Sequence, residues 1–175
     1  TMARGQTPEQ DLVNANALMR SEKDRAENTM IVDLMRNDLS KVCTDNSVHV
    51  DKWCGLESHP DVHHLVSVIN AELREGETAV SLLKACFPGG SITGAPKVRA
   101  MELIEQFETH RRGAYCGSIV WVSFAGDMDS SIVIRTVVAD EQTLTCHAGG
   151  AIVLESDPTA EYHETLLKAK ALTEV

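Results

Sequence analysis

Three apolar runs in the second half of the chain, separated by very short polar loops, most constrain the fold. They cover residues 115–124, 131–139 and 143–154, and the loops between them are residues 125–127 and 140–142. Loops this short are typical of strands that follow one another in an antiparallel sheet. The sequence therefore predicts an antiparallel meander in this part of the chain.

Helices are predicted on both sides of the meander. Residues 7–39 are rich in Ala, Leu, Met, Glu and Arg and predict one long helix or two in succession. Thr7 is the expected cap, Pro8 suits the first turn, and Gln10 can complete a capping box. Further helices are predicted over residues 78–87, from a Thr93 cap to about residue 110, and over residues 158–172; short strands are predicted at residues 48–50 and 62–69.

The helix predicted after Thr93 has an apolar face. Val98, Met101, Ile104 and Phe107 recur at spacings of three and form one stripe along it. The chain shows no internal repeat or linker, so residues 1–175 are expected to be one portion of a single domain. Because Met2 follows Thr1, we expect that portion to be a fragment.

Composition excludes several classes of function. Acidic residues outnumber basic ones, 26 to 16, so the formal charge is −10. That balance argues against binding to nucleic acid or to an anionic membrane surface. No run approaches the roughly 18 apolar residues of a membrane span. The five cysteines form no C-x-x-C pair, which favours reduced thiols in a cytoplasmic protein over disulfides or a zinc site.

Two pairs of carboxylates stand at helical spacing. Asp24 and Glu27 are three residues apart in the first helical region, and Glu161 and Glu164 are three apart in the last, followed by Lys168. Magnesium prefers one or two carboxylates together with water and substrate oxygens. Spacing alone favours the simpler interpretation, a solvated acidic helix face.

Other polar residues lie within apolar or glycine-rich segments. Residues 88–97 form a glycine-rich turn before a helix, where free backbone N–H groups favour anions, but they match neither the P-loop nor the dinucleotide fingerprint. His64 lies in a strand-like run, where a histidine is more often a core or surface residue than a catalyst. Arg135 lies in an apolar strand-like run and is expected to have a carboxylate partner. The glycines at 149 and 150 suggest a bulge or a close approach to a ligand.

Taken together and in order, these segments resemble the chorismate-utilising enzymes over essentially the whole chain. The matching segments are Asp24-Arg25-Ala26-Glu27-Asn28, Val32-Asp33-Leu34-Met35-Arg36-Asn37-Asp38, Val62-His63-His64-Leu65-Val66-Ser67, residues 88–102, Ile134-Arg135-Thr136, residues 148–153, and Glu161-Tyr162-His163-Glu164-Thr165. The glycine-rich turn and Tyr115-Cys116-Gly117-Ser118-Ile119 are more similar to the aminodeoxychorismate synthase component I type than to anthranilate synthase component I.

The resemblance implies a fold and a reaction. The fold would be α+β, with antiparallel sheets packed together and helices outside, and this chain would be its C-terminal half. The activity would be amination of chorismate to 4-amino-4-deoxychorismate on the folate route. A glutamine amidotransferase partner would supply ammonia, since none of the cysteines stands in a Gly-x-Cys-x-Gly elbow. Anthranilate synthase component I and a non-catalytic chorismate-binding fragment remain the alternatives.

The resemblance also implies a role for each matching residue. Glu27 and Glu164 would bind Mg²⁺, with Asp24 and Glu161 beside them, and the metal would hold the ring carboxylate of chorismate. His64 would act near the hydroxyl that leaves. The residues implied in substrate binding are Thr1, Ser91, Tyr115, Arg135, Gly149 and Lys168.

Two departures from the family pattern affect these expectations. Ala151 stands where the family has the third glycine of Ala-Gly-Gly-Gly-Ile-Val. Thr1 would end the family motif Pro-Ile-Lys-Gly-Thr, so the lysine expected as nucleophile would lie upstream of Thr1. This chain alone is therefore expected to be an incomplete catalyst that needs the missing N-terminal half of the same protein.

Overall fold

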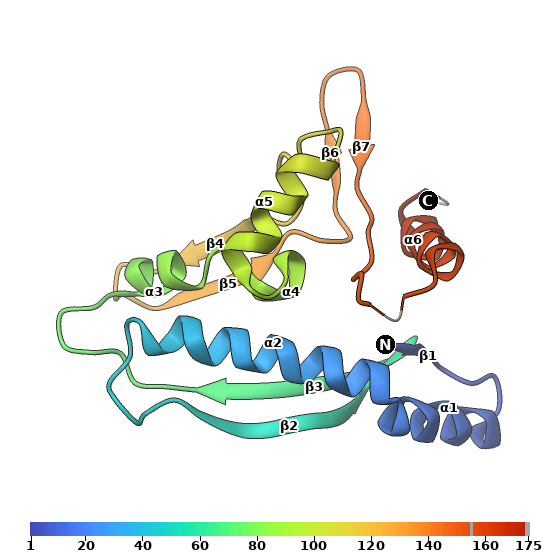
Figure 1. Ribbon diagram of the computed structural model, residues 1–175, viewed down its shortest axis with the longest axis horizontal. Helices are drawn as coiled ribbons and strands as arrows, with labels where there is room; N and C mark the ends of the chain where they lie inside the picture. Colours follow the sequence, from blue (N-terminus) through green and yellow to red (C-terminus); the bar gives the residue numbers. More distant parts are fainter. Residues whose placement is uncertain (155, 174–175) are drawn as a thin grey trace. The chain divides into compact units, whose positions relative to one another are not determined.

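The first part of the chain folds into two helices in succession. In the computed structural model, which describes residues 1–154 and 156–173, these are α1 (Pro8–Arg20) and α2 (Glu22–Ser40) (Figure 1). Thr7 caps α1 as predicted, since its hydroxyl accepts the Gln10 N–H at 3.3 Å. The Gln10 side chain donates to Asn14 at 2.9 Å instead of reaching back, so the predicted capping box is wrong.

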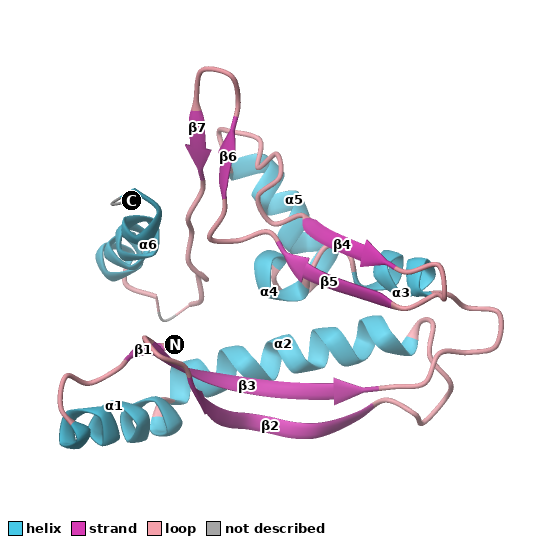
Figure 2. Cartoon of the chain, turned by 180° about the vertical axis from the view of Figure 1, so that it is seen from behind, coloured by secondary structure: helices cyan, strands magenta, loops and turns pink. Residues whose placement is uncertain are grey.

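A three-stranded antiparallel sheet follows, in the order β1-β3-β2. Its strands are β1 (Met2–Ala3), β2 (His49–Ser58) and β3 (Val62–Asn70). Strand β2 runs eight residues beyond the predicted end at Val50, because irregular register near Lys52 disguises the alternation that marks a strand. Helix α2 lies along this sheet (Figures 1 and 2).

The core of this part lies between α1, α2 and the strands. Leu18 is fully buried, and the other buried apolar side chains come from both helices, the following turn and β2. They are Ala15, Val32, Val42, Cys43 and Cys54. A charged group, Asp38 at the end of α2, is buried with them and is 2% exposed.

Three further helices lie before, within and after the glycine-rich turn: α3 (Ala79–Cys86), α4 (Gly90–Thr93) and α5 (Lys97–Phe107). Thr93 caps none of them: it ends α4, and its hydroxyl donates to the Gly89 carbonyl at 2.9 Å. The prediction of a Thr93 cap is therefore wrong, because the Ala95-Pro96 step delays the next helix.

The apolar stripe of α5 is largely exposed. Val98 is 72% exposed, Phe107 71% and Met101 43%. Amphipathic spacing is correct for a helix, but only a packing partner can bury the face that it creates.

The predicted meander is instead two separate hairpins. Strand β4 (Ser118–Val122) pairs with β5 (Met128–Ile132), and β6 (Val137–Ala139) pairs with β7 (Leu144–Cys146), both antiparallel. Both predicted loops are confirmed as the hairpin connections. The strand predicted over residues 131–139 is broken near Arg135, whose backbone has a φ of +52°.

The last helix is α6 (Pro158–Thr173), as predicted. The Asp157 carboxylate accepts the Ala160 N–H at 2.8 Å, and Pro158 takes the first helical position. The chain divides into two units, residues 1–101 and residues 102–175, which are described separately below. In the described part, none of the helices has the length and apolar character needed to cross a membrane.

A polar network, of which His63 is the buried member, joins α1 to the sheet of the first unit. Arg4 donates to both Asp11 carboxylate oxygens, at 2.7 and 2.8 Å, and the Gly5 N–H donates at 2.8 Å. His63 is 2% exposed, and its ring nitrogens lie 3.0 Å from Asp11 Oδ1 and 2.8 Å from Ser58 Oγ. The Arg4 hydrogen bonds, and then that of Gly5, hold the pKa of Asp11 well below its usual value.

This lowered pKa predicts an acid-sensitive contribution to stability. The Asp11 carboxylate stabilises the fold above its unfolded pKa of about 4, and the contribution is lost as pH falls through the lower folded pKa. We expect Asp11→Asn to lower the melting temperature at pH 7 and to lower it less at pH 3. Thermal melts across this range test it, with exposed Asp45→Asn as control. An equal loss at both pH values would contradict the assignment.

Candidate functional site

Two carboxylates of α6 converge on the glycine pair that precedes this helix. A Cβ added to Gly150 would lie 3.2 Å from Glu161 Oε2 and 3.9 Å from Glu164 Oε1. Glu161 is 6% exposed, and its Oε1 accepts the Ser156 hydroxyl at 2.6 Å. The space beside Gly150 is therefore bordered by anionic oxygen atoms, the donor type that magnesium prefers.

Lys168 lies one helical turn beyond Glu164 on the same helix. Its Nζ is 2.6 Å from Glu164 Oε1 and donates to the Gly149 carbonyl at 3.2 Å. These contacts connect α6 to the glycine segment. They also place a positive charge directly beside one of the two carboxylates.

The other carboxylate pair lies on α2, in the first unit. The Asp24 carboxylate accepts the Ser21 hydroxyl, and Ser21 Oγ accepts the Asp24 N–H at 3.2 Å in return. Asp24 therefore takes part in the cap of α2. The half-buried Glu27 carboxylate makes no hydrogen bond or ion pair with any residue in the described ranges.

His64 lies on β3 in the same unit. Residues 63 and 64 point to opposite faces of the sheet, so the histidine bound to Asp11 is His63 and not His64. His64 is half-buried, its ring meets that of His59 edge-on with centroids 5.5 Å apart, and Glu57 faces it on β2.

Contacts of Thr1 and Asn28 show that the α2 carboxylates and His64 lie in the same region of the first unit. The β1–β3 register pairs Met2 with His63, so Thr1 continues the strand toward His64, and its nitrogen lies 3.7 Å from Asp24 Oδ1. Asn28 donates to the Leu65 carbonyl at 3.3 Å and accepts the Ser67 hydroxyl at 2.5 Å. The first unit thus collects Thr1, Asp24, Glu27 and His64 at one end of α2.

The glycine-rich turn is attached to the far end of α2. Lys97 Nζ lies 2.5 Å from Asp38 Oδ2 and donates to the Pro88 carbonyl at 2.7 Å. Lys41 occupies the other Asp38 oxygen at 2.8 Å. A Cβ on Gly90 would lie 3.0 Å from the Leu34 side chain, so a larger residue at this position would require Leu34 to shift. Ser91 is exposed on α4.

Sequence reasoning missed the Asp38–Lys97 pair, although both residues belong to matching motifs. They are 59 positions apart, and a link over that distance has no periodic signal in one sequence. The only available signal was chemical: two charged residues inside otherwise helical and turn segments, each in need of a partner if buried.

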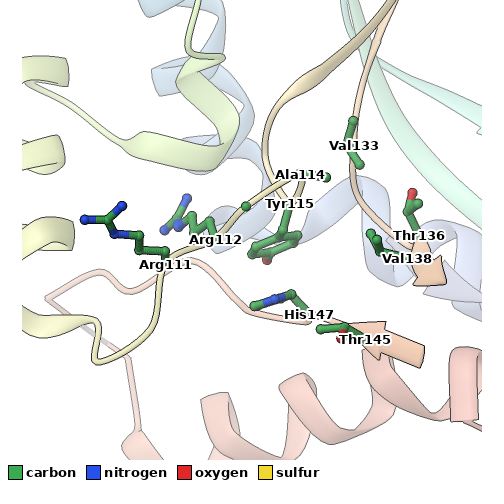
Figure 3. A pocket seen from close by; sticks show the side chains of 10 residues that line it. Arg111, Arg112, Ala114, Tyr115, Val133, Thr136, Val138, Thr145 and His147 are labelled. Carbon is green, nitrogen blue, oxygen red and sulfur yellow. The ribbon is translucent and has the colours of Figure 1, made fainter. Parts of the chain in front are cut away.

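Tyr115 lines a shallow cavity of about 210 Å³ in the second unit. Its ring stacks on that of His147 with centroids 5.4 Å apart, and Figure 3 shows the two side chains next to each other. A Cβ on Gly149 would lie 3.1 Å from the Tyr115 hydroxyl. Burial raises the pKa of Tyr115, and the neighbouring Cys116 raises it further, so the phenol stays protonated and can donate a hydrogen bond.

Arg135 does not occupy the strand position that the sequence predicted. It is exposed, lies between β5 and β6, and donates to the Lys168 carbonyl at 3.4 Å. Its expected carboxylate partner is not found among the residues that the structure describes. The bond to Lys168 uses one of five guanidinium N–H donors and places Arg135 beside α6.

The predicted site residues are thus divided between the units. Thr1, Asp24, Glu27, His64 and Ser91 lie in the first, and Tyr115, Arg135, Gly149, Glu161, Glu164 and Lys168 lie in the second. In the described ranges, no group of three or more His, Cys, Asp or Glu side chains is arranged to hold a metal ion. Each unit contains one of the two carboxylate pairs.

Comparison with known proteins identifies the family of this chain. The chorismate binding enzyme family matches residues 1–174, which include both units. The chain belongs to the chorismate-binding enzyme family. It is 54% identical to aminodeoxychorismate synthase component 1 of Klebsiella aerogenes over 98% of this chain, and 47% identical to anthranilate synthase component 1 of Aquifex aeolicus over the same share.

A solved structure agrees with the family assignment. Anthranilate synthase component I from Streptococcus pneumoniae superposes with a TM-score of 0.85 at 39% identity, over 98% of this chain and 41% of that one. The chorismate-binding fold, with its mixture of helices and antiparallel sheets, is therefore confirmed. The chain spans 38% of the length of the Klebsiella relative and 35% of the Aquifex one.

Proposed function

We propose that this chain is part of an aminodeoxychorismate synthase component I, which aminates chorismate to 4-amino-4-deoxychorismate. The observation that carries the proposal is the position of the Glu161 and Glu164 oxygens beside Gly150. Lys168 lies next to them and pairs with Glu164. An oxygen-lined space with an ammonium group beside it suits a divalent cation together with an anionic ligand. The 54% identity to two proteins named aminodeoxychorismate synthase component 1, against 47% to the Aquifex anthranilate synthase, supports the choice of reaction.

The cofactor in this proposal is Mg²⁺, held by Glu27 and Glu164 with Asp24 and Glu161 beside them. Both pairs offer carboxylate oxygens, and the space at Gly150 would be filled by any larger residue, so the donors fit a hard cation. When bound, the ion would neutralise the ring carboxylate of chorismate and fix the ring for attack.

The chain's own residues would bind the rest of the substrate. The protonated Tyr115 hydroxyl and the remaining donors of Arg135 are suited to the enolpyruvyl carboxylate, together with the backbone around Gly149. Ser91 and Thr1 would offer hydroxyl groups to the substrate. His64 would donate a hydrogen bond or a proton to the hydroxyl group that leaves.

Ammonia would come from a glutamine amidotransferase partner. The relatives are component 1 of their synthases, as their names state, and this wording supports a second component. We place the enzyme in the cytoplasm, as the five free thiols and the acidic surface suggest.

A product assay tests the proposal on the full-length polypeptide that carries these residues. With chorismate, magnesium and ammonium, we expect 4-amino-4-deoxychorismate, identified by chromatography with mass detection. Glutamine should replace ammonium only when the amidotransferase partner is added.

Two other outcomes of this assay would overturn the proposal. Anthranilate as the product would move the function to the alternative, which relatives named anthranilate synthase at 47% identity favour. Absence of turnover, with chorismate still bound, would leave a non-catalytic chorismate-binding protein.

A further inference from the structure

Lys168 places a positive charge beside the Glu161 and Glu164 carboxylates of α6. Its ammonium lies 2.6 Å from Glu164 Oε1, the oxygen that also faces the space beside Gly150. The pair is only partly exposed, with 30% of the Lys168 side chain and 43% of the Glu164 side chain accessible. A divalent cation at the carboxylates would therefore approach a positive charge that is already present.

The helix keeps that charge close to the site. Glu164 and Lys168 are four residues apart on α6, so their side chains lie on the same face. The second contact of Lys168, to the Gly149 carbonyl at 3.2 Å, holds the ammonium toward the glycine segment. A Lys168 displaced from Glu164 would still face the space beside Gly149 and Gly150, where it could meet an anionic group.

We propose that Lys168 is an internal counter-cation, which occupies the Glu164 carboxylate until a divalent metal and an anionic ligand bind together. The inference rests on the proposed function for the identity of the two ligands. Without an anion, the ammonium repels the metal and weakens its binding. A bound carboxylate accepts the displaced ammonium, so the repulsion becomes an attraction and each ligand strengthens the binding of the other.

Loss of Lys168 should change the metal affinity in the opposite direction from loss of a residue that only supports the site. Loss of a structural side chain weakens metal binding, whereas loss of a competing cation strengthens it in the absence of substrate. Because Lys168 in this proposal also attracts the anion, its loss should reduce the coupling between metal and chorismate, and linkage makes that reduction equal for the two ligands.

Isothermal titration of the full-length polypeptide with MgCl₂, in the presence and absence of chorismate and without ammonium, tests the proposal. For Lys168→Met without chorismate, we expect the magnesium dissociation constant to fall by about 5- to 10-fold. Chorismate should tighten magnesium binding in the wild type by a larger factor than in the variant. The variant should also melt at a lower temperature without metal and recover with saturating magnesium, because Glu161 and Glu164 then repel each other only in the metal-free state.

Two variants serve as controls. Lys170→Met removes the same charge from an exposed position on the same helix and should leave magnesium affinity unchanged. Lys168→Arg keeps the charge and should keep most of the coupling.

The proposal is overturned if Lys168→Met binds magnesium with equal or lower affinity without chorismate while the variant remains folded. That result would leave the proposed function intact, provided that the wild type still couples magnesium to chorismate. A wild type that shows no such coupling and forms no aminated product would overturn the proposed function as well.

Discussion

Replacing Glu27 by Gln lowers kcat/KM for chorismate by about 10³-fold and leaves the melting temperature unchanged. The half-buried Glu27 carboxylate makes no hydrogen bond or ion pair with the described residues, so folding gains little from its charge. The carboxylate is proposed to act only when the metal is bound. One anionic ligand then lowers the activation free energy by several kcal/mol, or roughly three powers of ten in rate. Steady-state kinetics of the full-length polypeptide, with a thermal melt of each variant, check both halves of the expectation.

A matched control stands on the same helix. Glu22 is exposed in the first turn of α2, and Glu22→Gln makes the same chemical change without approaching the site. We expect its kcat/KM to stay within twofold of the wild type. A Glu27→Gln protein with full activity, or one that loses activity only because it unfolds, would contradict the role given to Glu27.

Replacing Asp38 by Ala destabilises the first unit by about 3–5 kcal/mol, the usual cost of removing one partner from a buried ion pair. Asp38 is 2% exposed and receives Lys97 at 2.5 Å and Lys41 at 2.8 Å. Without it, the 15%-exposed Lys97 ammonium keeps, among the residues that the structure describes, only the Cys86 and Pro88 carbonyls as partners. Hydrogen exchange with mass detection on peptides from α2 should accelerate by about 10²- to 10³-fold.

Two further variants separate the buried pair from a general effect of charge. Asp33, on the same helix, is 69% exposed and pairs weakly with Arg36 at 3.5 Å, so Asp33→Ala should change stability by less than about 0.5 kcal/mol. Replacing Asp38 by Leu and Lys97 by Met together removes both charges and should recover part of the loss. Equal losses of stability in Asp33→Ala and Asp38→Ala would show that the buried ion pair contributes no more than an exposed one.

Local signals predicted much of the fold. The Thr7 and Asp157 caps, the prolines that follow them and the two hairpin loops lie where the sequence indicated. Caps and short loops can be predicted because their hydrogen bonds join residues only a few positions apart. The cap at Thr93 failed because the helix before it and the Ala95-Pro96 step after it compete for the same residues.

Arg135 shows where periodicity alone misleads. Its apolar neighbours indicated a continuous strand, yet the backbone turns there with a positive φ and the side chain is exposed beside α6. The break lets β5 and β6 pair with different partners. No pattern in the sequence marks it, because the reason lies in which strands find each other.

The sequence by itself determined the family, the carboxylate pairs and most of the helices, because motifs and caps are encoded over a few neighbouring residues. Tertiary structure alone decided that Glu161 and Glu164 meet beside Gly150, that Lys168 occupies Glu164, and that Asp38 and Lys97 tie the glycine-rich turn to α2. These contacts depend on burial and on the approach of distant segments. The role of a charged side chain depends on which groups surround it in the folded protein and on how far it is shielded from water.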